Sequence, residues 1–437
     1  MTNPATLCSN LSINAQGHLC FRGHDTLDLA AEYGTPLYLL DADRVRENCR
    51  IYLDTFLECF PAGSKPLFAS KALSFTGIYR IMKELGMGID VVSSGEIHTA
   101  RNAGFDLSQA FFHSNNKTDE DISFAMDAGV GYFVVDNPEE LLAIQAEAER
   151  RGIRQKVLLR LTPGIDTHTY EAVNTGKVDS KFGQAIETGQ ADAFTSLALA
   201  QPSLELKGFH CHVGSQVFTE DVFERAAEIM LRFIAHIRQT SGYSPAYLNL
   251  GGGYGVRYIE DDPHIDIPRK IRDVAAAVNK TCAELNIPVP AILMEPGRSI
   301  VADAGLTLYT AGSVKTIPGY RTYVAVDGGM SDNPRYALYG ARYTCYNAGR
   351  MTVPYEMECS LVGRCCESGD IIQPFLRLPA ETGRGDIMAV CTTGAYNYSM
   401  ASNYNRIPRP PIVMLREGSH ALAVRREQLA DLTALDL

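Results

Sequence analysis

Polar residues that could do chemistry recur where short apolar runs end. In chain order these residues are Lys71, Asp90, His113, Arg160, His212, the glycines 251–253, Glu295 and Arg298. If those ends share one rim, a lysine, a histidine, a glycine-rich loop, an acid and an arginine converge there. That set of groups is what a protein needs to hold a phosphorylated, aldehyde-bearing aromatic cofactor.

Lys71 and Glu295 are the two groups that would touch the reactive parts of such a cofactor. Lys71 follows the apolar run PLFAS, where reduced dielectric would lower the amine pKa and favour Schiff-base formation with an aldehyde. A solvated lysine at a strand exit is the alternative. A carboxylate at Glu295 would keep a ring nitrogen protonated and so make the ring a strong electron sink. The alternative is an ion pair between Glu295 and Arg298.

The glycine loop and a histidine pair supply the remaining candidate contacts. Glycines 251–253 let backbone N–H groups approach an anion, and phosphate binds at this end of many barrels, although a tight turn is the alternative. His210 and His212 point to one face of a strand and could hold a metal. No third ligand follows at a recognisable spacing, so we expect no metal. A flat His212 stacked on a cofactor ring fits better, and Ser215 could donate to phosphate.

Three later segments also carry reactive side chains. They are DGGMSDNPRYALYG with Arg335 and Tyr339, the segment 366–370 with Cys366 and Glu367, and TGAYNYSMASNYN with Tyr396 and Tyr398. Each could be ordinary loop chemistry, because Gly, Asn and Ser dominate turns. A small buried hydrophobe is the alternative for Cys366.

Eight apolar runs alternate with segments of helical spacing, which predicts parallel βαβ units. The runs lie at 65–70, 88–93, 110–114, 132–136, 156–161, 206–213, 247–251 and 291–295. Eight strands close a (β/α)8 barrel, which we favour over a doubly wound open sheet. Helical spacing is clear at 119–129 and at 138–152, where Pro138 stands near the start and Gly152 at the end.

After residue 308 the pattern changes to apolar runs separated by Gly, Pro, Asn and Asp, with no long helix between them. These runs lie at 321–327, 356–364, 370–378, 386–394 and 420–426. They predict a mostly antiparallel β domain. The run PLYLLD at 36–41 could join it. We therefore predict a barrel over 43–308 and a β domain from 1–42 and 309–437.

Composition narrows the class of protein and its partners. The net charge of −11 argues against a nucleic-acid binder and against an anionic membrane surface. No apolar stretch reaches the roughly 18 residues of a membrane span, and the N-terminus has no signal-peptide pattern. Eleven cysteines without a CxxC pair suit reduced thiols. We expect a cytoplasmic protein acting on a small molecule.

Taken together, the motifs resemble the alanine-racemase-like class of pyridoxal-phosphate enzymes, and within it the diaminopimelate decarboxylase family. The resemblance runs from about residue 33 to about residue 410. It rests on YGTPLYLLDADRVR, FASKA, GIDVVSSGE, NNKTDEDI, VDSKFG, GFHCHVGSQ, LNLGGGYG, EPGR, DGGMSDNPRYALYG, CESGD and GAYNYSMASNYN. The family often reads HTHxYI after the fifth strand, whereas this chain has Tyr170 for the second histidine and Ala172 for the tyrosine.

The resemblance implies pyridoxal 5'-phosphate as cofactor, a barrel plus a β domain, and a homodimer with shared active sites. It implies roles residue by residue. Lys71 would be the Schiff-base lysine, His212 would stack on the ring, Glu295 would pair with the ring nitrogen, and Cys366 would donate the proton from the second subunit. Phosphate and cofactor contacts would include Asp90, Ser215, Gly252, Gly253, Gly297, Arg298 and Tyr396, and substrate contacts Arg298, Arg335, Tyr339, Glu367 and Tyr396.

The expected reaction is the decarboxylation of meso-2,6-diaminopimelate to L-lysine and carbon dioxide. The distal end of this substrate carries an ammonium and a carboxylate, so its pocket needs both an acid and a base, which Glu367 and Arg335 supply. An arginine facing a substrate without that carboxylate would be an unpaired, desolvated charge. Ornithine, lysine or arginine decarboxylation on the same fold is the nearest alternative. An amino-acid racemase fits less well, because Glu295 and Cys366 count against it. An inactive regulatory homologue also fits less well, because it need not keep Lys71, Glu295 and Cys366 together.

Overall fold

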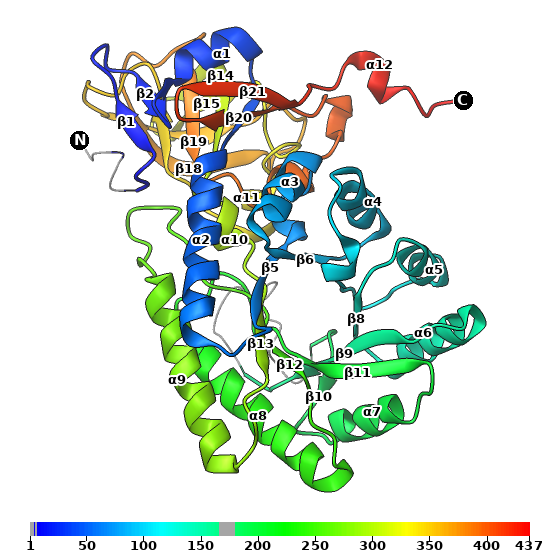
Figure 1. The fold of residues 1–437 in the computed structure, drawn as a ribbon. Coiled ribbons are helices and arrows are strands. Elements are labelled where there is room, and N and C mark those ends of the chain that lie inside the picture. Colours follow the sequence, from blue (N-terminus) through cyan, green and yellow to red (C-terminus); the bar gives the residue numbers. More distant parts are fainter. Residues whose placement is uncertain (1–3, 5–6, 166–179) are drawn as a thin grey trace. The chain divides into compact units, whose positions relative to one another are not determined.

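The computed structural model describes residue 4, residues 7–165 and residues 180–437. The chain forms two compact units. The first unit comprises Met1–Glu47, Val256–His264 and Arg298–Leu437, and the second comprises Asn48–Gly255 and Ile265–Gly297. Figure 1 shows the second unit as a ring of strands and helices and the first as a group of β-strands.

The second unit is a parallel eight-stranded barrel, as predicted. Its strands are β5 (Lys65–Ala69), β6 (Gly88–Val91), β7 (Ala110–Phe112), β8 (Tyr132–Val135), β9 (Gln155–Thr162), β11 (Leu204–His210), β12 (Tyr247–Asn249) and β13 (Ala291–Met294). They pair in the order β9-β11-β12-β13-β5-β6-β7-β8, and the pairing of β8 with β9 closes the ring. The closure excludes the open-sheet alternative. A short strand β10 (Gln184–Ala185) adds to β9.

Among the described residues, one helix leads into the first barrel strand and seven connect the strands to one another, and their ends follow local capping chemistry. They are α2 (Ala42–Cys59), α3 (Thr76–Leu85), α4 (Ser94–Asn102), α5 (Asp119–Asp127), α6 (Pro138–Arg151), α7 (Gln190–Leu199), α8 (Val222–Ser241) and α9 (Ile267–Leu285). The Asn137 side chain caps α6 before Pro138, and Gly152 ends it in the left-handed conformation. None of the described helices combines the length and apolar character of a membrane span.

Branched and aromatic side chains pack inside the barrel. A buried cluster takes one residue from each of five strands, namely Leu67, Phe111, Val134, Leu158 and Leu293. These residues alternate along their strands with side chains that face outward. The interior is therefore a packed core at this level, so functional groups are confined to the ends of the strands.

The first unit is built on a mostly antiparallel sheet, also as predicted. Its path is β18 (Ile371–Leu378), β17 (Met357–Val362), β15 (Arg321–Val326), β14 (Gly305–Ile317), β4 (Leu37–Asp41), β20 (Ile412–Arg416) and β21 (Ser419–Val424). Strand β19 (Ile387–Cys391) pairs with β14 and with β16 (Cys345–Asn347). The run at 36–41 joins this sheet as β4, beside β14 and β20.

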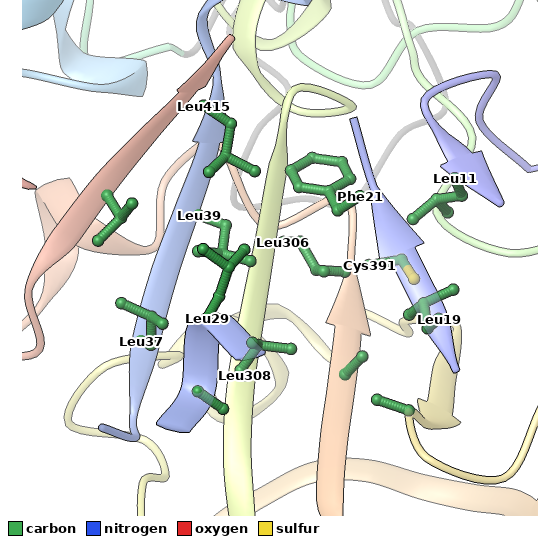
Figure 2. Close-up of a cluster of buried hydrophobic side chains, with 14 of the residues drawn as sticks. Leu11, Leu19, Phe21, Leu29, Leu37, Leu39, Leu306, Leu308, Cys391 and Leu415 are labelled. Atoms are coloured by element: carbon green, nitrogen blue, oxygen red, sulfur yellow. The ribbon is translucent and has the colours of Figure 1, made fainter. Parts of the chain in front are cut away.

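Smaller elements complete the first unit. They are β1 (Leu11–Ile13), β2 (Leu19–Phe21), β3 (His24–Asp25), α1 (Thr26–Tyr33), α10 (Arg298–Val301), α11 (Arg335–Tyr339) and α12 (Leu429–Leu432). Figure 2 shows the core where leucines of β4 and β14 meet Cys391 of β19 and Phe21. This core ties the N-terminal residues to the sheet formed by the C-terminal half of the chain.

Candidate active site

Lys71 stands directly after β5, in a short 3-10 helix over Ser70–Ala72. Ser70 and Ala72 are fully buried, whereas the Lys71 side chain is exposed. The sequence predicted a reduced dielectric around the Lys71 amine. The protein alone does not provide it, because this side chain is exposed to solvent. The Lys71 charge still reaches the strand ends, because it opposes the burial that raises the pKa of Asp90 and adds to the burial that lowers the pKa of His212.

Glu295 follows β13, the neighbour of β5 in the barrel, and is held from three sides. The Asn249 amide donates to Oε1 at 2.7 Å, and His113 Nε2 lies 2.8 Å from the same oxygen. His210 Nε2 forms a hydrogen bond of 3.1 Å with Oε2. Glu295 and His210 are 8% and 1% exposed. The carboxylate is thus fixed in one orientation by groups from three other strand ends.

These contacts keep the buried carboxylate ionised. Burial by itself raises the pKa of Glu295, but His113 and His210 hold it well below its ordinary value. The His210 imidazole has a pKa lowered to about 4, because burial outweighs the attraction of Glu295. An anionic carboxylate beside neutral imidazole at pH 7 can hold a proton on a basic ring nitrogen.

His113, His210 and Glu295 also offer three possible metal ligands within 4.8 Å of one another. Each histidine Nε2 already lies at contact distance from a carboxylate oxygen. The contacts that clamp Glu295, a hydrogen bond to His210 and an ion-pair distance to His113, therefore account for this cluster. Sequence analysis treated His210 only as one member of a possible metal-binding pair. Its contact with Glu295 could be recognised only from the tertiary structure.

Asp90, at the end of β6, is buried with one oxygen free. Its Oδ1 has no hydrogen-bond partner among the described residues. Burial raises its pKa to about 6, while His113, Lys71 and Arg160 oppose that rise. An orphaned carboxylate oxygen in this position is suited to accept a proton or a hydrogen bond from a ligand.

The glycine loop packs its backbone against the neighbouring strand ends. A Cβ added at Gly251, Gly252 or Gly253 would lie 2.6, 2.0 or 2.2 Å from a carbonyl oxygen. The Gly252 N–H donates to His212 Nδ1 at 3.3 Å. Burial, aided by Lys71 and Arg160, holds the pKa of His212 well below its ordinary value. His212 is therefore a neutral, flat ring fixed beside the glycine loop.

Gly297 and Ser215 also lie in loops that follow barrel strands, after β13 and β11 respectively. A Cβ at Gly297 would lie 2.9 Å from the Ala69 Cβ, so the EPG segment packs closely on β5. Ser215 follows His212 in the loop after β11 and is half-buried. The barrel therefore brings together Lys71, Asp90, His212 and Glu295 with the glycine loop, as the sequence predicted for one rim.

In the first unit, two buried arginines share one tyrosine that sequence analysis missed. Arg298 Nη1 donates to the Tyr258 hydroxyl at 2.6 Å, and the Arg335 guanidinium lies 4.9 Å from the Tyr258 ring centroid. Burial raises the pKa of Tyr258, but the two arginines bring it below its ordinary value. Two guanidiniums around one phenol form a strongly cationic patch that suits an anionic ligand.

Three further residues extend this patch. The Tyr396 ring lies 4.8 Å from the Arg298 guanidinium. Arg335 Nη1 donates to the Tyr343 hydroxyl at 3.1 Å, and that hydroxyl donates to Asn397 Oδ1 at 3.2 Å. The structure thus joins Arg298, Arg335 and Tyr396. No sequence spacing marked Tyr258, Tyr343 or Asn397, because they come from separate loops.

Cys366, Glu367 and Tyr339 lie apart from these contacts. Cys366 and Glu367 are exposed on the loop between β17 and β18, and Tyr339 is the half-exposed last residue of α11. The buried-hydrophobe alternative for Cys366 is wrong, since Cys366 is the exposed thiol among the eleven cysteines. Tyr170 and Ala172, where the chain departs from the family pattern, lie outside the described residues.

Comparison with known proteins places the chain in a class. Residues 44–302 match the family described as "Pyridoxal-dependent decarboxylase, pyridoxal binding domain". This match covers the barrel and the strand ends that carry Lys71, Asp90, His212 and Glu295. The fold and the rim therefore define a decarboxylase of the pyridoxal-dependent class.

Individual relatives narrow the class further. The chain is 44% identical over 425 residues to diaminopimelate decarboxylase of Halalkalibacterium halodurans, covering 97% of this chain and 96% of the relative. It is 42% identical over 426 residues to that of Bacillus subtilis, with 97% and 96% covered. A crystal structure of the M. jannaschii diaminopimelate decarboxylase with L-lysine has a TM-score of 0.90 and 31% identity, with 98% of each chain covered. The chain belongs to the diaminopimelate decarboxylase family.

Proposed function

We propose that this chain decarboxylates meso-2,6-diaminopimelate to L-lysine and carbon dioxide with pyridoxal 5'-phosphate as its cofactor. The observation that carries the proposal is the clamped, anionic Glu295 one strand away from Lys71. A racemase, which must limit electron withdrawal by the ring, has no use for that carboxylate.

The residues on the barrel rim fit pyridoxal 5'-phosphate. The glycine loop leaves no room for side chains and presents backbone to an anion. Asp90 Oδ1 is a buried acceptor without a hydrogen-bond donor among the described residues. Glu295 is a buried anion that a protonated ring nitrogen would neutralise. Lys71 would hold the cofactor covalently and His212 would lie against its ring. Ser215, Gly252, Gly253, Gly297, Arg298 and Tyr396 would complete its phosphate and ring contacts.

When bound, the cofactor supplies a protonated ring that accepts the electron pair left at the substrate Cα as carbon dioxide departs. Glu295 holds the ring proton, and His113, His210 and Asn249 keep that carboxylate from turning away. Cys366 then delivers a proton to Cα through its Sγ. Its exposed position suits a thiol that acts in a partner subunit's site, so we propose a homodimer with shared active sites.

Charge complementarity selects the substrate. The distal carboxylate and ammonium of diaminopimelate would meet Arg335 and Glu367, and Tyr339 would line the same end. Arg335 is 6% exposed, and no carboxylate lies within ion-pair distance of it among the described residues, where its partners are Tyr258 and Tyr343. A buried guanidinium needs an anion, which ornithine and lysine lack at that end. The 31%-identical M. jannaschii relative was solved with L-lysine, the expected product.

We assign cofactor binding to residues 43–308 and assign residues 1–42 and 309–437 to completing the active site and the dimer interface. We also place the reaction in the cytoplasm. All eleven cysteines are unpaired thiols, as a reducing compartment favours.

Carbon dioxide release from the holoenzyme tests the substrate. We expect turnover of meso-diaminopimelate at least about 100-fold above that of ornithine, lysine or arginine, because the latter leave Arg335 desolvated without a carboxylate. An Arg335→Met variant should lose most of that preference, with Arg377→Met, an exposed arginine of β18, as its control. Faster release from any monocarboxylate would overturn the substrate assignment.

A further inference from the structure

The loop that carries Cys366 and Glu367 is exposed at its tip and buried at its base. The four residues 366–369 are exposed, whereas the flanking Cys365 and Asp370 are 9% and 4% exposed. Because the side chains at the exposed tip pack against few neighbours, packing does little to fix their orientation. The contacts at the base must therefore set the direction in which Cys366 and Glu367 project.

The Asp370 carboxylate holds two separate segments at this base. Its Oδ2 accepts the Cys365 N–H at 2.7 Å, inside its own loop, and its Oδ1 accepts the Met330 N–H at 2.6 Å, from the segment after β15. No lysine, arginine or histidine lies within ion-pair distance of Asp370 among the described residues. Two backbone N–H groups and the Cys365 thiol are thus the partners that offset the burial of its charge.

Two glycines make room for this carboxylate. A Cβ on Gly329 would lie 2.5 Å from the Asp370 oxygens, and one on Gly363 would lie 2.3 Å from Oδ2. The Gly363 N–H also donates to the Asp370 carbonyl at 3.0 Å. The carboxylate is therefore inserted between two backbones, a placement that neither a longer nor a differently shaped side chain can reproduce.

The Met330 segment leads directly to Arg335. The Asp332 and Asn333 N–H groups both donate to the Gly329 carbonyl, at 3.0 and 2.8 Å, and α11 begins at Arg335. The Asp370 carboxylate therefore contacts both the start of the turn that leads to Arg335, which Asp332 also holds through the Gly329 N–H, and the base of the loop that carries Cys366 and Glu367.

A second anchor acts on Cys366 itself. The Cys366 N–H donates to Asn405 Oδ1 at 2.7 Å. Asn405 is exposed and has a left-handed backbone (φ 53°), which asparagine tolerates better than most residues. The loop that carries Asn405 is joined to the Met330 segment by the Ser402 N–H, which donates to the Ser331 carbonyl at 2.8 Å.

We propose that Asp370 and Asn405 are positioning residues, which fix the Cys366 thiol and the Glu367 carboxylate in one geometry relative to Arg335. This inference rests on the proposed function, because it takes the roles of Cys366, Glu367 and Arg335 from there. Neither anchor touches substrate. Each acts through the backbone of the loops that do.

The test compares Asp370→Asn with Asp41→Asn in the holoenzyme. Asp41 is the control, since it is buried in the same unit and accepts the Asp43 and Arg44 N–H groups at 3.1 and 2.9 Å at the start of α2. It differs from Asp370 in also having Arg22 at 3.7 Å and the Asn10 amide at 3.1 Å. Both variants should melt at lower temperature than the wild type. Only Asp370→Asn should lower kcat/KM for meso-diaminopimelate by roughly 100-fold, the effect of a displacement of about 1 Å. Asp41→Asn should stay within about threefold per folded enzyme.

Alkylation of Cys366 by N-ethylmaleimide separates a positioning role from a merely structural one. In the wild type, L-lysine should slow this alkylation, and Asp370→Asn should abolish the protection while Asp41→Asn keeps it. Asn405→Ala, an exposed substitution expected to fold, should lower kcat/KM by roughly tenfold through loss of one hydrogen bond. Asn403→Ala, in the same loop but without contact to Cys366, should change it less than twofold.

Unchanged kcat/KM and unchanged lysine protection in Asp370→Asn would overturn the proposal, and so would equal effects of Asn405→Ala and Asn403→Ala if Asp370→Asn fails to fold. Hydrogen exchange of the Met330 and Cys365 amides tests the anchor without any turnover, with exchange roughly tenfold faster expected in Asp370→Asn. If the wild type releases no carbon dioxide from diaminopimelate while this exchange difference holds, the proposed function fails and the anchor stands.

Discussion

At the residue scale, the site depends on buried charges whose partners come from distant parts of the chain. Glu295 is the clearest example, because it meets His113, His210 and Asn249 from three other strand ends. A carboxylate in that position without donors would take up a proton and lose its charge. The histidines therefore act on the reaction through Glu295.

Lys71→Ala removes the group proposed to hold the cofactor. The exposed side chain contributes little packing, so the variant should fold with a melting temperature close to that of the cofactor-free wild type. Turnover should fall by roughly 1000-fold or more, on the scale of lost catalytic side chains. Absorbance in the visible range of the protein-bound cofactor is the measurement, and Lys65→Ala, at the start of the preceding strand β5, is the control. A yellow, active Lys71→Ala protein contradicts the assignment.

We expect the buried His210 to make the free energy of unfolding decrease at acidic pH. Burial lowers its folded-state pKa to about 4, whereas an unfolded histidine titrates near 6.5. Between these values the unfolded chain binds a proton that the folded chain does not, so stability falls as pH drops from about 6.5 to 4. The free energies of unfolding of the wild type and of His210→Asn, measured with urea, should approach each other by about 3 kcal/mol as the pH falls across this range. A constant difference at every pH would contradict the burial of a neutral His210.

At the scale of elements, strand order decides which residues meet. Strands β11, β12 and β13 are neighbours, so the loops after them place His212, the glycine loop and Glu295 side by side. The close approach of these loops is possible only because Gly252 has no side chain: a Cβ there would lie 2.0 Å from the Glu295 carbonyl oxygen.

Gly252→Ala should therefore displace the glycine loop without unfolding the barrel. We expect cofactor affinity and turnover to fall by roughly 100-fold, since a shift of about 1 Å at a binding loop has effects on this scale. Gly95→Ala in α4 is the control, because its nearest neighbour would be the Ser93 Oγ at 3.6 Å. Absorbance titration with pyridoxal 5'-phosphate measures the affinity, and equal affinities of the two variants would refute the loop's role.

At the scale of the whole molecule, the proposed reaction needs residues from both compact units. Lys71 and Glu295 belong to the barrel, and Cys366, Glu367 and Arg335 belong to the β unit. If each subunit supplies its Cys366 to the site of the other, the dimer has two composite sites related by a twofold axis.

Mixing two inactive variants tests this exchange. In a one-to-one mixture of Lys71→Ala and Cys366→Ala subunits, half of the dimers are mixed and each mixed dimer has one intact site of two. Activity should therefore recover to about a quarter of the wild-type level. A mixture of Lys71→Ala with the double variant Lys71→Ala/Cys366→Ala should recover nothing. No recovery in the first mixture would mean that both groups act within one subunit.

The sequence by itself determined the architecture and most of the barrel rim. Eight apolar runs became the eight barrel strands, because a strand buried on both faces reads as a continuous apolar segment. Polar residues after those runs had to share one rim, since parallel strands end together. Strands β14, β16 and β20 were not among the predicted runs, and the structure defines them by their pairing with neighbours such as β4 and β19.

Only the tertiary structure decided how the charges are held. Spacing could not reveal that His113 and His210 clamp Glu295, that Tyr258 lies between Arg298 and Arg335, or that Asp370 joins two loops. These contacts link residues far apart in the chain, and no local rule encodes them. Local propensity and periodicity act over a few residues, whereas the ionisation and orientation of a buried group depend on whatever the fold packs against it.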